Sequence, residues 1–142
     1  MIGKIISIKN SIVYVSLSIN IYQVENMIGK NVTFGNRYIG EISAISSNIL
    51  EISLIGEIVN NMFIPGSIGV PSFGMECRLT TNEEIDIIYG VNRNGNIIKI
   101  GKSFVYNNYD VCLDVNSFFS GHFAIFGNSG SGKSYFVSRL LQ

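Results

Sequence analysis

The sequence lacks an excess of charge of either sign, because ten lysine and arginine residues balance ten aspartate and glutamate residues in a chain of 142. A net charge of zero gives no whole-chain indication of a nucleic-acid or membrane partner. Cysteine is also scarce, since the chain has only Cys77 and Cys112, which stand far apart. Their number and spacing exclude a disulfide framework and a zinc site, so we expect reduced, buried thiols.

Long apolar segments are missing as well. The longest stretch without charge, residues 58–75, contains both prolines of the chain together with glycine and asparagine, and is therefore a poor membrane span. The first residues lack the small-residue cleavage site of a signal peptide. With His122 as the single histidine, no catalytic set of serine, histidine and aspartate can be assembled. These absences predict a soluble, cytoplasmic protein with no membrane contact.

The first half of the chain carries a series of β-strand patterns. Apolar and polar residues alternate over 11–19, and residues 4–8 precede them across a short polar turn, which predicts a hairpin. Further runs rich in β-branched residues occupy 31–34, 38–46 and 49–59. Glycine recurs inside these runs, where it marks bends. Short strands with glycine bends predict a small β-barrel over roughly the first seventy residues.

A domain boundary is expected near residue 75, at the end of the stretch rich in proline and glycine. We therefore predict a barrel domain at 1–75 and the start of a second domain at 76–142. Short strands are predicted at 75–79 and 111–115, and a short turn of helix or a loop follows the second of them.

A helix is predicted over 80–90. Thr80 with Glu83, and Thr81 with Glu84, both have the spacing of a capping box, in which each side chain bonds the backbone N–H of the other residue. Acidic residues in the first turn also favour a helix start, because they interact well with the positive end of the helix dipole.

The stretch GNSGSGKS at 127–134 has the spacing of a phosphate-binding loop. Its glycines let backbone N–H groups converge on a phosphate, towards which the following helix points its positive end. In this pattern Lys133 reaches the β- and γ-phosphates, and the hydroxyl of Ser134 binds Mg²⁺. The apolar run 122–126 predicts a strand before the loop, and 133–142 predicts a helix after it. The expected ligands are ATP and Mg²⁺. The predicted binding residues are Gly127, Asn128, Ser129, Gly130, Ser131, Gly132, Lys133, Ser134 and Tyr135.

These patterns together predict a mainly β fold class: a small N-terminal β-barrel followed by the first elements of an α/β P-loop NTPase core. Asp114, which ends an apolar strand, is a weaker candidate for supporting Mg²⁺, and a solvated strand end is the alternative. His122 is expected to be a hydrogen-bonded structural residue.

The order of segments resembles the start of a HerA-type ATPase, of the HerA–FtsK class of DNA-translocating motors. The resemblance rests on IGVPSFGMECRLTTNEEI at 68–85, IGKSF at 100–104 and DVCLDVNSFFSGHFAIFGNSGSGKS at 110–134. It implies that Lys133 is a phosphate-binding lysine, that Ser134 is a magnesium ligand, and that ATP hydrolysis drives movement along double-stranded DNA. It also implies a homo-oligomer, expected as a hexameric ring assembled through the barrel, with a nuclease of the NurA type as a further partner.

The core of that family continues well beyond its phosphate loop. We therefore expect the chain to be the N-terminal part of such a translocase or helicase, truncated just after the Walker A motif and inactive in hydrolysis by itself. Two alternatives stay open. The chain is a stand-alone, non-catalytic assembly or partner-docking module, or it belongs to a rotary ATP-synthase-like ATPase, which also places a barrel before a phosphate loop.

Overall fold

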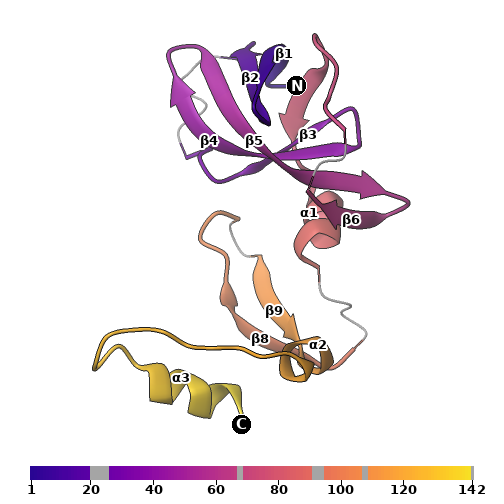
Figure 1. Cartoon of the computed structure of the whole chain (residues 1–142). Coiled ribbons are helices and arrows are strands. Elements are labelled where there is room, and N and C mark those ends of the chain that lie inside the picture. The colour runs from indigo at the N-terminus through magenta and orange to yellow at the C-terminus, as the bar shows by residue number, and fades with distance from the viewer. Residues whose placement is uncertain (20–25, 67–68, 91–94, 107–108, 142) are drawn as a thin grey trace. The chain divides into compact units, whose positions relative to one another are not determined.

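The computed structural model describes residues 1–19, 26–66, 69–90, 95–106 and 109–141. The chain forms two compact units, Met1–Ile88 and Tyr89–Gln142, and each is described by itself (Figure 1).

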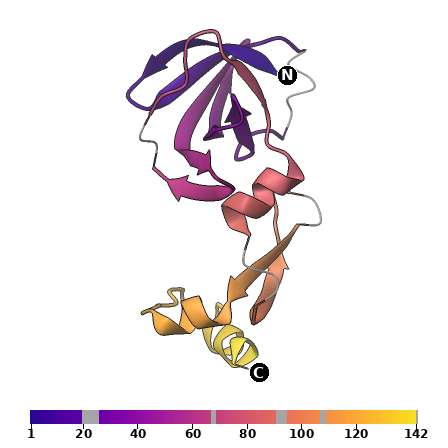
Figure 2. The same cartoon turned by 90° about the vertical axis from the view of Figure 1, so that its right-hand side faces the viewer.

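Seven strands make up the sheet of the first unit. They are β1 (Gly3–Lys9), β2 (Ile12–Leu17), β3 (Asn31–Phe34), β4 (Tyr38–Ser46), β5 (Ile49–Val59), β6 (Met62–Pro65) and β7 (Glu76–Leu79). Their order is β2-β1-β7-β3-β4-β5-β6, and an additional pairing of β2 with β5 closes all but β6 into a barrel (Figure 2). β1 and β2 form the expected antiparallel hairpin. The predicted fold class, mainly β with a small N-terminal barrel, is confirmed.

The core of the barrel consists of side chains that alternate along the strands. The pairing of β2 with β5 sets Val13 opposite Ile52 and Val15 opposite Leu50, and all four side chains are fully buried. A Cβ atom at Gly40 of β4 would lie 2.4 Å from Cγ2 of Ile52, so only glycine lets these two strands approach so closely. The alternation that predicted β2 therefore also supplies side chains to the interior.

The barrel unit extends past the boundary expected at residue 75. β7 pairs with both β1 and β3, and so it supplies a wall strand between them. Helix α1 (Asn82–Tyr89) follows at once, and its Ile85 is 3% exposed. The barrel closes only when β7 is included, and the compact unit that contains it ends at Ile88.

A hydrogen-bond network ties α1 to the barrel. Thr81 and Glu84 form the predicted capping box: the N–H of Thr81 donates to Oε2 of Glu84 (2.9 Å), and the N–H of Glu84 donates to the hydroxyl of Thr81 (3.3 Å). The guanidinium of Arg78, on β7, donates to both carboxylate oxygens of Glu84 at 2.7 and 2.8 Å. The hydroxyl of Thr33, on β3, donates to the same carboxylate at 3.1 Å.

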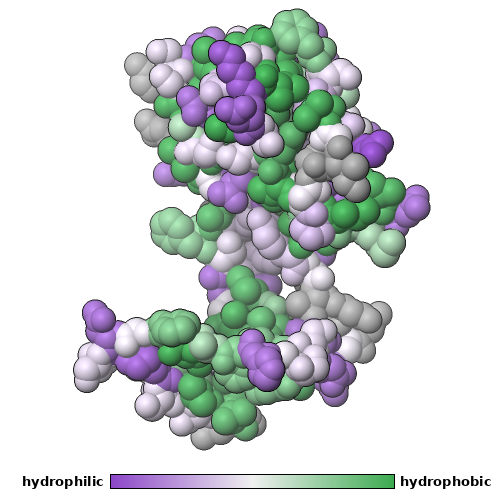
Figure 3. Space-filling view, in the orientation of Figure 1, coloured by the Kyte–Doolittle hydropathy of each residue, from purple (hydrophilic) through white to green (hydrophobic). Residues whose placement is uncertain are grey.

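The second unit contains two strands and two helices. β8 (Ile97–Lys102) pairs with β9 (Asp110–Asp114) in a two-stranded sheet, which α2 (Val115–Ser120) follows directly. The last helix, α3 (Lys133–Leu140), confirms the helix predicted after the loop, and Gln142 lies outside the described residues. Leu140 is the one buried apolar side chain among the described residues of this unit, and apolar groups are visible on its surface (Figure 3). In the described part of the chain, no helix has the length and apolarity needed to cross a bilayer.

The strand predicted at 122–126 is wrong. These residues form an irregular segment that pairs with no strand in the described part of the chain. Phe123 and Phe126 are accordingly 47% and 90% exposed. A strand needs a neighbour for its N–H and C=O groups, and here β8 and β9 pair only with each other.

Candidate phosphate-binding loop

The predicted loop lies between the irregular segment and α3, and it has the backbone of a tight turn. The N–H of Ser131 donates to the carbonyl of Asn128 at 3.2 Å, which closes the turn. Gly130 and Gly132 have φ of 78° and 84°. This left-handed region favours glycine, because a Cβ atom would clash with the neighbouring backbone. The spacing of glycines seen in the sequence thus corresponds to a conformation that requires them.

The N-terminus of α3 is open. Gly132 is the N-cap and makes no side-chain capping hydrogen bond. The first i→i−4 hydrogen bond of α3 runs from the N–H of Phe136 to the carbonyl of Gly132 at 2.9 Å. The N–H groups of residues 133–135 therefore have no intrahelical acceptor, and the helix dipole adds positive potential at the same end. Such a terminus is suited to an anion.

Other helix N-termini in the described residues are closed by side chains. The carboxylate of Asp114 accepts a hydrogen bond from the N–H of Ser117 at 2.7 Å at the start of α2. The hydroxyl of Thr81 plays the same part for α1. Glycine at the start of α3 thus leaves donors uncovered that a serine, threonine or aspartate would bind.

The side chain of Lys133 folds back onto the loop. Its ammonium group donates to the carbonyl oxygens of Gly127 at 2.7 Å and Asn128 at 2.6 Å, and the side chain is half-buried. An ammonium group has three N–H donors, so two of them hold the cation above the loop and the third is free to meet an anion. The structure thus brings together the lysine, the glycine turn and the open helix end.

The remaining predicted residues of the loop are polar and exposed. Ser129, Ser131 and Ser134 all lie on the surface, and Ser134 is the second residue of α3. Its hydroxyl is an oxygen ligand of the type that Mg²⁺ prefers. The described residues contain no cluster of three or more His, Cys, Asp or Glu side chains that could hold a metal ion. A magnesium ion at this loop would therefore depend on the Ser134 hydroxyl and on phosphate oxygens of the ligand.

The other candidate residues of the sequence analysis lie outside the loop. Hydrogen bonds from Ser117, the backbone N–H first, lower the pKa of Asp114, which acts as a helix cap. The sequence signal for this cap was an aspartate directly before a short helical run. His122 lies exposed in the irregular segment. Cys77 is buried as expected, whereas Cys112 is only half-buried, and neither forms a disulfide.

A glycine-rich turn, a lysine folded onto it and a helix with an open N-terminus are features that suit an anion. Residues 98–142 match the family model described as "Helicase HerA, central domain". The matched segment contains all but the first residue of β8, together with β9, α2, the whole loop and α3, and this part of the chain is similar to that family. A search of curated proteins found no match. The expected resemblance to HerA-type ATPases is thus supported over 98–142, and the barrel expected upstream is present.

Proposed function

We propose that the chain supplies the assembly barrel and the ATP-binding loop of an ATP-dependent DNA translocase of the HerA type. The observation that carries the proposal is the loop 127–134, where the Lys133 ammonium is held on the loop carbonyls and the N-terminus of α3 has no side-chain cap, within the segment that matches the HerA central domain. In this proposal Lys133 binds the β- and γ-phosphates of ATP and Ser134 binds Mg²⁺.

The distribution of charge supports different binding roles for the two units. Residues 1–88 contain eight acidic and five basic residues, whereas residues 89–142 contain five basic and two acidic residues. The formal net charges are therefore −3 and +3, which cancel in the whole chain. Double-stranded DNA attracts basic surfaces, so we assign the DNA-facing part of the motor to the second unit. The acidic barrel unit is assigned to contacts with protein, either in a hexameric ring or with a nuclease of the NurA type.

The chain is expected to bind ATP without hydrolysing it at a useful rate. Phosphoryl transfer requires groups that orient water and stabilise charge around the γ-phosphate. Residues 89–142 contain two carboxylate side chains, Asp110 and Asp114. Asp110 pairs with Lys99 at 2.7 Å and Asp114 caps α2, so neither is placed for this role. In the proposal, hydrolysis needs residues from further motor elements. The proposed location of the protein is the cytoplasm.

The test is ATP binding in the presence of Mg²⁺, measured by equilibrium dialysis on the 142-residue chain. We expect Lys133→Met to weaken binding by about tenfold to a hundredfold, the range for removing a hydrogen bond to a charged group. Lys9→Met is the matched control, because it removes the same charge from an exposed position on β1. Equal binding by the K133M, K9M and wild-type chains would contradict the proposal.

A second candidate function is a partner-docking module that does not depend on nucleotide. The observation in its favour is that the barrel closes completely within residues 1–88. The match of residues 98–142 favours the DNA-motor class over a rotary ATP-synthase-like subunit. If the chain captures a protein partner equally well with and without ATP, and K133M has no effect on that capture, the docking module is the better description.

A further inference from the structure

Tyr135 is an exposed aromatic residue at the edge of the candidate loop. It is the third residue of α3, directly after the predicted magnesium ligand Ser134, and it is 77% exposed. Leu140, on the same helix, is 6% exposed, so α3 does have a side that other groups cover. A tyrosine ring left in water forgoes the favourable free energy of burying its apolar surface, and such a ring beside a ligand site is suited to cover part of the ligand.

Tyr135 lies in the first turn of α3, beside the N-terminus of the helix. Side chains on an α-helix tilt towards the N-terminus, so a residue in the first turn covers the surface beside that terminus. The N–H of Tyr135 is also the last of the three first-turn donors without an intrahelical acceptor, because the next one, from Phe136, is bonded to Gly132. The phosphates would therefore meet the backbone of Tyr135, and the nucleoside attached to them would pass beside its ring.

We infer that Tyr135 stacks on the base of the bound nucleotide and makes the site prefer a nucleoside triphosphate, above all a purine, over a bare polyphosphate chain. The inference rests on the proposed nucleotide-binding function of the loop. Lys133 and the glycine turn recognise only phosphate, which is common to every nucleotide and to inorganic polyphosphate. An aromatic ring adds recognition of the base through its π-face, and purines present the larger face.

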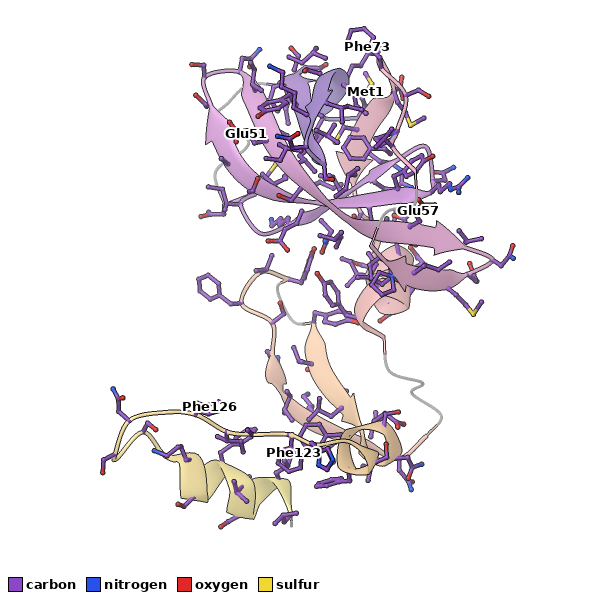
Figure 4. All side chains as sticks on the ribbon, in the orientation of Figure 1. Met1, Glu51, Glu57, Phe73, Phe123 and Phe126 are labelled. Atoms are coloured by element: carbon purple, nitrogen blue, oxygen red, sulfur yellow. The ribbon has the colours of Figure 1, made fainter. Side chains whose placement is uncertain are left out.

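Two other exposed aromatic residues flank the loop and are less suited. Phe126 lies before the loop, in the irregular segment, and not on the helix whose donors face the ligand (Figure 4). Phe136 is one position further along α3, so its side chain points about 100° away around the helix axis. Phe136 is therefore the matched control: an aromatic residue of the same helix, 42% exposed, that the inference assigns no base contact.

The experiment compares the binding of ATP and of inorganic tripolyphosphate, each with Mg²⁺, by equilibrium dialysis on the complete chain. We expect the wild-type chain to bind ATP more tightly than tripolyphosphate. Tyr135→Ala should weaken ATP by about tenfold, the size of a lost base–aromatic stack, and leave tripolyphosphate unchanged. Tyr135→Phe should keep ATP binding within about twofold, because the ring remains. Phe136→Ala should leave the ratio of the two affinities unchanged.

The outcomes separate this inference from the proposed function. If Tyr135→Ala weakens both ligands equally, the tyrosine supports the loop structurally and the inference is wrong, while nucleotide binding stands. If it weakens neither, or if the wild-type chain binds both ligands equally, the base is not recognised here and the inference is again wrong. If Lys133→Met leaves both affinities unchanged, the loop is not the phosphate site, and the proposed function fails together with the inference.

Discussion

Glu84 is the residue whose replacement tests most directly how α1 is held on the barrel. Its side chain is 14% exposed, and its carboxylate accepts bonds from Arg78, Thr33 and the N–H of Thr81. Glu84→Gln keeps the shape and removes the charge. A hydrogen bond to a charged group contributes about 1.5–3 kcal/mol and a helix cap about 1 kcal/mol, of which glutamine retains part. We therefore expect the free energy of unfolding of the barrel unit to decrease by about 2 kcal/mol at pH 7.

The same variant makes a prediction about pH. Burial opposes ionisation of Glu84, yet hydrogen bonds from Arg78 and from the Thr81 N–H outweigh it and hold the pKa of Glu84 below its ordinary value of 4.5. A carboxyl group with a lowered folded-state pKa contributes stability that is present above its unfolded pKa and lost as the pH decreases through the folded value. The difference between wild type and E84Q should thus be largest above pH 4.5 and should shrink at lower pH.

Urea denaturation followed by far-UV circular dichroism, at 0.15 M NaCl and at several pH values, measures both effects. The control is Glu83→Gln, which removes the same charge from the adjacent, exposed position of α1 and should change stability by about 0.5 kcal/mol or less. In thermal unfolding, E84Q should lower Tm by about 10 °C, because a loss of 1 kcal/mol lowers Tm by about 4–8 °C for a unit of this size. The reasoning is refuted if E84Q and E83Q are equally stable at pH 7, or if the loss from E84Q persists undiminished at low pH.

Two further predictions follow from the backbone and from burial. Gly132→Ala places a Cβ at φ of 84° and should weaken ATP binding measurably, whereas Gly121→Ala, at φ of −102°, should leave it unchanged. The result contradicts the proposed loop if both variants bind ATP as the wild type does. Burial raises the pKa of Cys77 to about 12, so a thiol reagent at pH 8 should modify Cys112 rapidly and Cys77 only after unfolding in urea. Two rapidly reacting thiols in the folded chain would show that β7 is not a buried wall strand, and a Cys112→Ser variant identifies which thiol reacts.

The features that could be predicted from the sequence depend on residues close together in the chain. Alternation over β2 predicted that strand and its buried face, because side chains of a strand point to opposite sides in turn. β-branched residues predicted β5. The capping box of Thr81 and Glu84 was recognisable because its partners are three residues apart. The loop 127–134 was recognisable because its glycines, its lysine and the following helix lie within one short stretch.

Tertiary structure decided the pairing partners of the short strands. Residues 75–79 were expected to open the second domain, yet β7 lies between β1 and β3 in the barrel wall. Residues 122–126 have the apolar composition of a strand, yet they pair with none in the described part of the chain. A strand is defined by hydrogen bonds to segments that are distant in sequence, and local composition does not specify where those segments lie. The sequence by itself thus determined the loop and most elements, while strand pairing across the chain determined where the barrel ends.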